Sequence, residues 1–281
     1  MKFLLSDGCF YHLPLEKVFI IASKSGFEGV EIIWDGLDDL ETKKIKKLIQ
    51  KYQLNVPVVH EPFSFHKITG WPEKTNERLP YLLKEAENIG AEKIVVHTAT
   101  DIENINWQLK NIPILQQSTN IKICMENMPE DYGVLLNISR RINKFYRKMF
   151  GIPYKSTTSK IKKMVLLMKE NRKYFLNNPE QLKKFENIIL DTTHLGTYGK
   201  DPSDFYLNIK DKIKHIHLSD FGPQEHLLPG KGWLKLQKFK NTLIENNYSE
   251  TISLEVDPKA FKNADNLESS IEELKAVRNL F

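Results

Sequence analysis

The sequence predicts a single α/β domain over residues 1–281, a (β/α)₈ TIM barrel with a helical, basic insertion after its fifth strand. Eight short β-rich runs recur along the chain, and segments with helical periodicity separate most of them. Alternating strands and helices favour parallel pairing through right-handed crossovers, and eight such units can close into a barrel. The length of 281 residues is typical of such a barrel. The first strand also lacks the glycine-rich turn of a dinucleotide-binding open sheet.

The individual elements follow from apolar periodicity. Strands are expected at residues 2–6, 29–34, 55–60, 93–97, 121–127, 187–191, 214–220 and 251–257. Helices are expected at 15–26, 37–52, 75–90 and 235–247, because apolar residues recur there at three- and four-residue steps. Gly26 and Gly90 close two of these stretches, where a glycine commonly ends a helix.

The stretch between the fifth and sixth expected strands is strongly basic. Residues 133–187 hold 14 Lys and Arg against 3 Asp and Glu, a net charge of +11, while the whole chain carries +5 and the remainder therefore −6. Two or three helices are expected in it, at about 134–150, 159–176 and 179–186, and because it follows the C-terminal end of a strand we expect it over the barrel mouth. It is either a solvated helical face or an arm that attracts phosphate groups.

The composition indicates a compact globular protein. Hydrophobic residues make up 41% and charged residues 27% of the chain, without the apolar depletion of disordered segments. Cys9 and Cys124 lie far apart and form no CxxC pair, which favours a reducing, cytoplasmic setting. The first residues lack the long apolar stretch of a signal peptide, and no run approaches the roughly 18 apolar residues of a membrane span.

Ionisable residues mark the C-terminal ends of six expected strands. In barrel enzymes this rim holds the active site. Each residue alone is more often a hydrogen-bonded rim residue than a ligand, but several buried carboxylates and imidazoles together need a shared counter-charge. A mixed set of Glu, Asp and His suits a Zn²⁺ or Mn²⁺ cofactor better than Mg²⁺ or Ca²⁺. The six residues are His60, His97, Glu126, Asp191, His217 and Glu255.

Two spaced pairs and one glycine-containing loop extend this pattern. Asp191 and His194 form an Asp-x-x-His step after the sixth strand, and His217 and Asp220 form a second step in which Asp220 is a candidate to orient an imidazole. His226 opens the segment HLLPGKG, whose two glycines permit a tight turn and a close backbone approach to a ligand.

Taken together, these stretches resemble the superfamily of xylose-isomerase-like barrels. That superfamily contains sugar isomerases and epimerases together with the endonuclease IV family of abasic-site nucleases (AP endonuclease family 2). The resemblance extends over nearly all strands, through GFEGVEI (26–32), VVHEP (58–62), CMENM (124–128), LDTTH (190–194), HIHLSD (215–220), PGKG (229–232) and LEVD (254–257). The motifs are specific for the superfamily and much less specific for one activity.

The isomerase branch implies one ion held by Glu126, Asp191, His217 and Glu255. By resemblance, the ion would chelate a carbonyl and the adjacent hydroxyl of the substrate, and Glu126 and Glu255 would transfer the proton between them. The implied activity is that of a divalent-metal-dependent isomerase or epimerase acting on a sugar, sugar phosphate or related small polyol. The oligomeric state is left open.

The nuclease branch implies more than one ion. One of its sites maps onto His60, His97 and Glu126, and the next onto the four residues above. Its third site resembles His194 and His226 with an Asp two residues before the latter, where this chain has Gln224. A phosphodiester hydrolase acting on abasic-site DNA is therefore the alternative, and the basic 133–187 segment would suit a phosphorylated sugar or a nucleic-acid backbone equally.

The four histidines outside the isomerase set keep two interpretations. In an isomerase, they would bind substrate hydroxyls or a second ion rather than complete a nuclease centre. A barrel that has lost its chemistry and serves as a binding protein is a third possibility. The four are His60, His97, His194 and His226.

Overall fold

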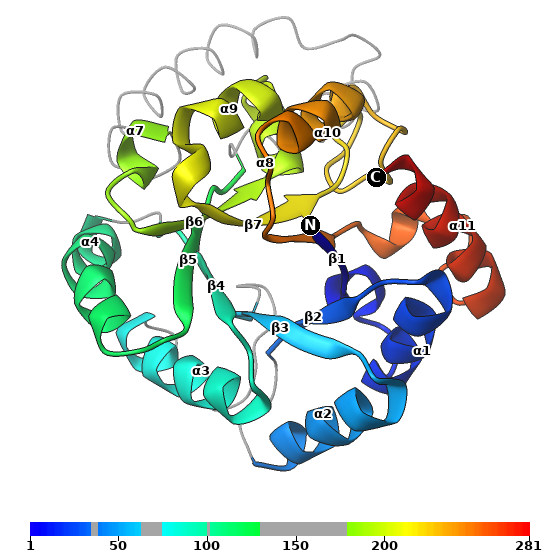
Figure 1. The fold of residues 1–281 in the computed structure, drawn as a ribbon, viewed down its shortest axis with the longest axis horizontal. Coiled ribbons are helices and arrows are strands. Elements are labelled where there is room, and N and C mark those ends of the chain that lie inside the picture. Colours follow the sequence, from blue (N-terminus) through cyan, green and yellow to red (C-terminus); the bar gives the residue numbers. More distant parts are fainter. Residues whose placement is uncertain (35–38, 63–74, 100–101, 130–178) are drawn as a thin grey trace, which may run out of the picture.

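A computed structural model describes residues 1–34, 39–62, 75–99, 102–129 and 179–281. Eight parallel strands close into one barrel in chain order, and β1 pairs with β8 to complete the ring (Figure 1). All eight expected strands are present and the predicted fold class is confirmed. The strands are β1 Lys2–Ser6, β2 Gly29–Ile33, β3 Asn55–His60, β4 Lys93–His97, β5 Lys122–Glu126, β6 Asn187–Asp191, β7 Ile213–Leu218 and β8 Thr251–Leu254.

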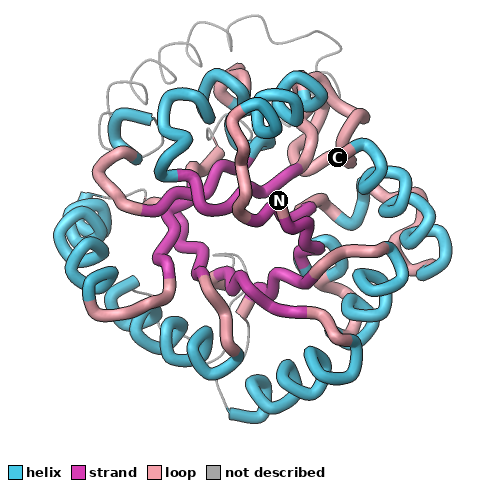
Figure 2. The backbone as a smooth tube through the Cα atoms, in the orientation of Figure 1, coloured by secondary structure: helices cyan, strands magenta, loops and turns pink. Residues whose placement is uncertain are grey.

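Helices surround the strands as an outer ring (Figure 2). The expected helices correspond to α1 Leu15–Ser25, α2 Asp39–Tyr52, α3 Thr75–Ile89 and α10 Leu236–Glu245. The ring also contains α4 Ile102–Gln117, α7 Pro179–Leu182, α8 Thr192–Thr197, α9 Pro202–Ile209 and α11 Leu267–Leu280. Short 3₁₀ turns are η1 Asp7–Phe10, η3 Lys210–Lys212 and η4 Pro258–Ala260.

The predicted basic insertion falls mostly outside the described residues. The gap covers 130–178, so the expected helices at 134–150 and 159–176 lie outside the part of the chain that the structure describes. The third expected helix, at 179–186, corresponds to the single turn of α7.

Helix α1 illustrates how local sequence sets the outer ring. Val18, Ile21 and Ala22 are buried at three- and four-residue spacing, so one face of the helix packs on the strands. Gly26 follows with φ of +78°, a left-handed conformation in which its N–H donates to the carbonyls of the last helical turn. Helix α11 packs beside α1, which brings the two ends of the chain together (Figure 1).

The barrel interior contains an apolar cluster separate from the main core between strands and helices. Because side chains alternate along a strand, a residue two positions further along points to the same face. Val58, Val95, Cys124 and Ile189 of the cluster each precede a candidate ligand by two residues, so those ligands share the inward face at the C-terminal end of the barrel. The cluster consists of Leu4, Val58, Val95, Cys124 and Ile189.

Among the described residues, no helix has both the length and the apolar character that crossing a bilayer requires.

Candidate metal centre

Four of the predicted ligands meet at one point. Glu126 on β5, Asp191 on β6, His217 on β7 and Glu255 just after β8 each offer a ligand atom, and these atoms all lie within 4.8 Å of one another. Glu126 Oε1 and Glu255 Oε2 are each 3.0 Å from His217 Nδ1, and Asp191 Oδ2 is 3.8 Å from it. All four residues are buried.

The charges of this cluster do not balance. Burial, reinforced by Glu126 and Glu255, raises the pKa of Asp191 to about 8, although His226 opposes the shift. Burial acts in the same direction on Glu255, but the adjacent His217 outweighs it and lowers the pKa of Glu255 to about 2. Three buried carboxylates around one imidazole therefore lack positive charge, which is the environment that a bound cation stabilises.

Two carboxylate oxygens in the cluster have no hydrogen-bond partner. Glu126 Oε2 and Asp191 Oδ2 are buried and accept no hydrogen bond within the described residues. The other oxygen of Asp191, Oδ1, accepts the His194 N–H at 2.7 Å and begins helix α8. Because buried carboxylate oxygens are normally satisfied, and because three carboxylates with one imidazole suit a Zn²⁺- or Mn²⁺-type ion, the residues present fit a divalent metal.

A second ligand group shares Glu126. His60 Nε2 and His97 Nε2 lie 3.6 and 3.4 Å from Glu126 Oε2. Glu61 supports this group from behind, because its Oε1 accepts the His97 N–H at 2.7 Å and lies 3.4 Å from His97 Nδ1. Its other oxygen accepts a hydrogen bond from Arg78 at 3.2 Å.

A third group joins Asp191 to the remaining two histidines. Asp191, His194 and His226 offer ligand atoms within 4.8 Å of one another. His194 Nδ1 lies 2.8 Å from the Asn127 carbonyl oxygen, and His226 adopts a φ of +54°. Such a φ is uncommon for a residue other than glycine and marks a constrained position.

Asp220 has a different environment from the one expected. Its carboxylate accepts four backbone N–H groups, those of Phe221 and Leu234 through Oδ1 and those of Gly230 and Gly232 through Oδ2, at 2.9 to 3.0 Å. A side chain at Gly232 would collide with the Phe221 carbonyl and with this carboxylate. Asp220 thus organises the PGKG loop, and the close approach that Gly232 permits is to Asp220.

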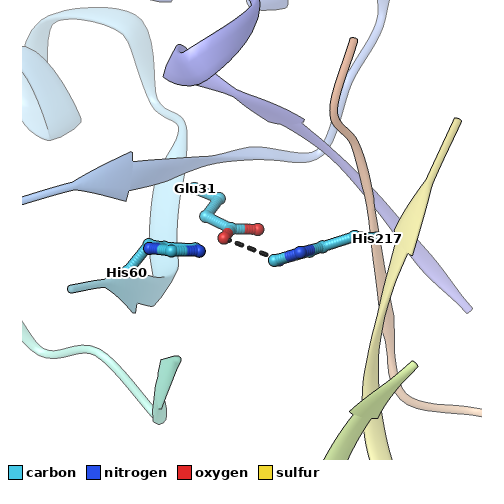
Figure 3. A group of neighbouring side chains, drawn as sticks. All are labelled: Glu31, His60 and His217. Atoms are coloured by element: carbon cyan, nitrogen blue, oxygen red, sulfur yellow. Dashed lines mark hydrogen bonds and ion pairs between the residues drawn. The ribbon is translucent and has the colours of Figure 1, made fainter. Parts of the chain in front are cut away.

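Sequence reasoning missed Glu31 and His215. Glu31, on β2, is fully buried and accepts hydrogen bonds from His217 Nε2 and His215 Nε2, each at 2.9 Å. Figure 3 shows the Glu31 carboxylate between the rings of His60 and His217. The available signal was a carboxylate inside the apolar strand GVEII, since a charge is rarely buried there without partners.

A cavity of about 350 Å³ lies over the cluster. Glu126, Glu255, His97, His194 and His226 line its polar side. Tyr11, Met128, Pro129, Val256 and Pro258 are among its other lining residues. This size is at the lower end of small-molecule sites, so two of the four principal ligands, Glu126 and Glu255, lie on the wall of a pocket that can hold a small molecule.

Residues 181–277 match the family model described as xylose isomerase-like TIM barrel, which confirms the resemblance found in the sequence. An uncharacterised protein of Mycobacterium tuberculosis is 23% identical over 285 residues, covering 97% of this chain and 95% of that protein. A fructoselysine 3-epimerase of Shigella flexneri is 22% identical over 260 residues, covering 87% of this chain and 86% of that protein.

Solved structures of other proteins share this fold. A D-tagatose 3-epimerase-like protein superposes with a TM-score of 0.66 at 19% identity, covering 100% of this chain and 97% of that chain. An AP endonuclease of family 2 from Brucella melitensis superposes with a TM-score of 0.56 at 15% identity, covering 92% and 93%. These similar structures include both enzyme classes that the motifs implied.

Proposed function

We propose that this protein is a divalent-metal-dependent isomerase or epimerase that acts on a sugar, sugar phosphate or related small polyol. The observation that carries the proposal is the placement of Glu126, at the end of β5, and Glu255, just after β8. Both contact His217 Nδ1 at 3.0 Å, and both line the cavity. Two carboxylates on separate strands can act on the same carbon from different sides. The epimerase names among the similar proteins support the same reading.

The chemistry divides between the cofactor and the side chains. A bound divalent ion would polarise the carbonyl of the substrate and acidify the adjacent C–H. Glu126 and Glu255 each use one oxygen toward His217, and we assign the second oxygen of one carboxylate to take up the substrate proton. The carboxylate that took up the proton returns it to the neighbouring carbon, which gives an isomer. Return to the opposite face of the original carbon, which gives an epimer, requires the other carboxylate to enter the cycle protonated.

The proton transfer can be followed directly. We expect the metal-loaded protein in D₂O to incorporate deuterium next to the carbonyl of a ketohexose or ketohexose phosphate, as read by NMR. Glu126→Gln and Glu255→Gln should each slow this exchange by about 10²- to 10⁴-fold, the usual contribution of a general acid or base. Glu225→Gln is the matched control, because Glu225 lines the same cavity but belongs to none of the ligand groups. Absence of deuterium exchange with every ketohexose and ketohexose phosphate tested, at full metal loading, would contradict the proposal.

One observation favours a second candidate, a metal-dependent phosphodiester hydrolase. Glu126 belongs both to the four-residue group and to the group with His60 and His97, and a bridging carboxylate is the arrangement that two-metal hydrolysis needs. Cleavage of a duplex with a single abasic site, together with two or more ions per chain, would favour this candidate over the isomerase.

A further inference from the structure

We propose that Glu31 is a positioning residue, which holds the His217 ring so that its Nδ1 faces the metal cluster. This inference rests on the proposed metal centre. Glu31 belongs neither to the four-residue ligand group nor to the residues that line the cavity.

Glu31 is a charged residue in an apolar layer of the barrel. On β2 it pairs in register with Val58 of β3, and Val58 belongs to the interior cluster with Val95, Cys124 and Ile189. An ionised carboxylate at this depth is costly unless its oxygens are fully bonded. Its presence there therefore calls for a specific partner.

Both oxygens of Glu31 are bonded to imidazoles of the same strand. Oε1 accepts from His217 Nε2 and Oε2 accepts from His215 Nε2, each at 2.9 Å. Because Nε2 of His217 carries the hydrogen toward Glu31, the ring nitrogen that remains for a cation is Nδ1. Nδ1 is also the nitrogen that lies beside Glu126 and Glu255. A carboxylate behind a ligating imidazole fixes its tautomer and orientation in this way.

Glu31 is better placed for this role than for binding an ion itself. Glu31, His60 and His217 offer atoms close enough to form a separate ligand group (Figure 3). An ion there would take His217 Nε2 away from Glu31 and break the hydrogen bond between them. Glu126 Oε2 and Asp191 Oδ2 accept no hydrogen bond within the described residues, and an ion bound at Glu31 would still leave both without a partner.

His215, the second partner of the Glu31 carboxylate, is itself hydrogen-bonded. His215 Nδ1 lies 2.7 Å from Thr251 Oγ1, and the buried Lys93 donates to the same hydroxyl at 2.9 Å. Lys93 also pairs with Glu250 at 2.9 Å. Glu31 is therefore held through His215, whose other ring nitrogen is hydrogen-bonded at Thr251.

The test is metal affinity in the full chain, measured with Co²⁺ and Zn²⁺. Glu31→Leu removes the acceptor at similar volume, and Glu31→Gln leaves one oxygen where two N–H groups need acceptors. We expect the Co²⁺ dissociation constant to rise by about 10- to 100-fold in Glu31→Leu, the usual effect of losing such a partner, and by at least about tenfold in Glu31→Gln. The visible absorption of bound Co²⁺ should change in both, because the orientation of the imidazole changes.

Lys93→Met is the matched control. It removes only the outer end of this chain of contacts and touches neither histidine, so it should lower the unfolding temperature while leaving the Co²⁺ affinity and spectrum unchanged. If Glu31→Leu does not fold, Glu31→Gln decides the question by the same measurements. Equal Co²⁺ affinity in the wild type and in the folded Glu31 variants would overturn the positioning role and leave the proposed function standing. A wild type that binds no metal would overturn both.

Discussion

At the scale of single residues, the candidate centre is unusual in how many ligand atoms share one carboxylate. Glu126 contacts His217 through Oε1 and lies near His60 and His97 through Oε2. In a one-metal isomerase only the first contact would belong to the principal ion, and the two other histidines would bind substrate hydroxyls. In a hydrolase both contacts belong to ions. The number of bound ions therefore separates the two functions.

We expect His97→Gln to leave one tightly bound ion per chain, because none of the four principal ligands is changed. Its kcat/KM for the sugar should fall mainly through KM if His97 binds a substrate hydroxyl. Elemental analysis after dialysis, compared with Glu126→Gln as the variant that removes a principal ligand, measures this. A wild type with two ions and a His97→Gln variant with one would favour the hydrolase.

At the scale of elements, the loop after β7 is held in shape by the Asp220 carboxylate, which accepts backbone N–H groups of the loop as a helix or strand would. Four backbone N–H groups converge on this carboxylate, and the loop carries His226 toward the cluster. The orientation of His226 is therefore coupled to the packing of a loop in which Gly232 has no room for a side chain.

Gly232→Ala should destabilise the fold by about 1 to 3 kcal/mol, the usual cost of inserting a methyl group into a filled space. The added Cβ would meet the Phe221 carbonyl and the Asp220 carboxylate, neither of which is a flexible side-chain end free to move. Gly199→Ala is the control, since Gly199 has a φ of +65° but nothing within 4 Å of its Cβ position. That variant should cost only about 1 to 2 kcal/mol of backbone strain, without affecting the cluster. Urea unfolding gives both values, and a Gly232→Ala cost no greater than that of Gly199→Ala would contradict the steric argument.

At the scale of the whole molecule, the two ends of the barrel are stabilised differently. At the N-terminal end, Glu250 just before β8 pairs with Lys93 of β4 at 2.9 Å and with Lys122 of β5 at 3.1 Å. At the C-terminal end, carboxylates gather without matching positive charge. The charges at the N-terminal end are paired within the protein, whereas we expect the C-terminal end to gain stability from a bound cation.

The Glu250 ion pairs predict a pH dependence at the N-terminal end. Burial raises the pKa of Glu250, but the hydrogen bonds and charges of Lys93 and Lys122 outweigh it, and the net pKa is lowered. A depressed carboxylate pKa contributes stability above the unfolded-state value, and that stability is lost as the pH falls through the folded-state value. Glu250→Gln should therefore cost about 1 to 3 kcal/mol near pH 7, because it leaves Lys93 buried without its charge partner.

The cost of Glu250→Gln should be smaller near pH 3 than near pH 7, because the stability that the ion pairs contribute is lost as the pH falls through the lowered folded-state pKa of Glu250. Denaturant unfolding at both pH values is the measurement. Lys183→Met removes an exposed pair with Glu180 and should change stability by less than about 1 kcal/mol at either pH. A Glu250→Gln cost that stays constant with pH would rule out the ion pair as its source.

Metal removal should act on the C-terminal end. A ligand at 100 times its dissociation constant stabilises the folded state by about 2.7 kcal/mol, and for a chain of this size each kcal/mol moves the Tm by about 2 to 4 °C. We therefore expect a chelator to lower the Tm of the metal-loaded protein by about 5 to 10 °C. The Glu126→Gln, Glu255→Gln double variant should show no chelator effect. An equal Tm shift in both proteins would mean that the ion binds elsewhere.

Much of this arrangement was predictable from local sequence. The eight strands and the convergence of Glu126, Asp191, His217 and Glu255 follow from two rules that operate over a few residues. Side chains alternate along a strand, and the C-terminal ends of parallel strands meet on one rim. A residue that ends a β-rich run is therefore placed at that rim whatever its distant neighbours are.

The partners behind these ligands were not predictable. Asp220 was expected to orient an imidazole because of its spacing from His217, but its carboxylate is taken by the backbone of its own loop. The residue that holds His217 is Glu31, 186 positions away. No periodicity within β2 indicates what lies across the barrel from it.

The sequence by itself therefore determined the order of the strands, the closed barrel and the rim on which ionisable groups gather. Only the tertiary structure decided which groups touch, which oxygens are left without hydrogen bonds, and that β2 supplies a carboxylate to two histidines of β7. The physical reason is that strand alternation is a local property of the backbone. Contact across the barrel depends instead on closure, through which β1 pairs with β8 and brings β2 and β7 to face the same interior.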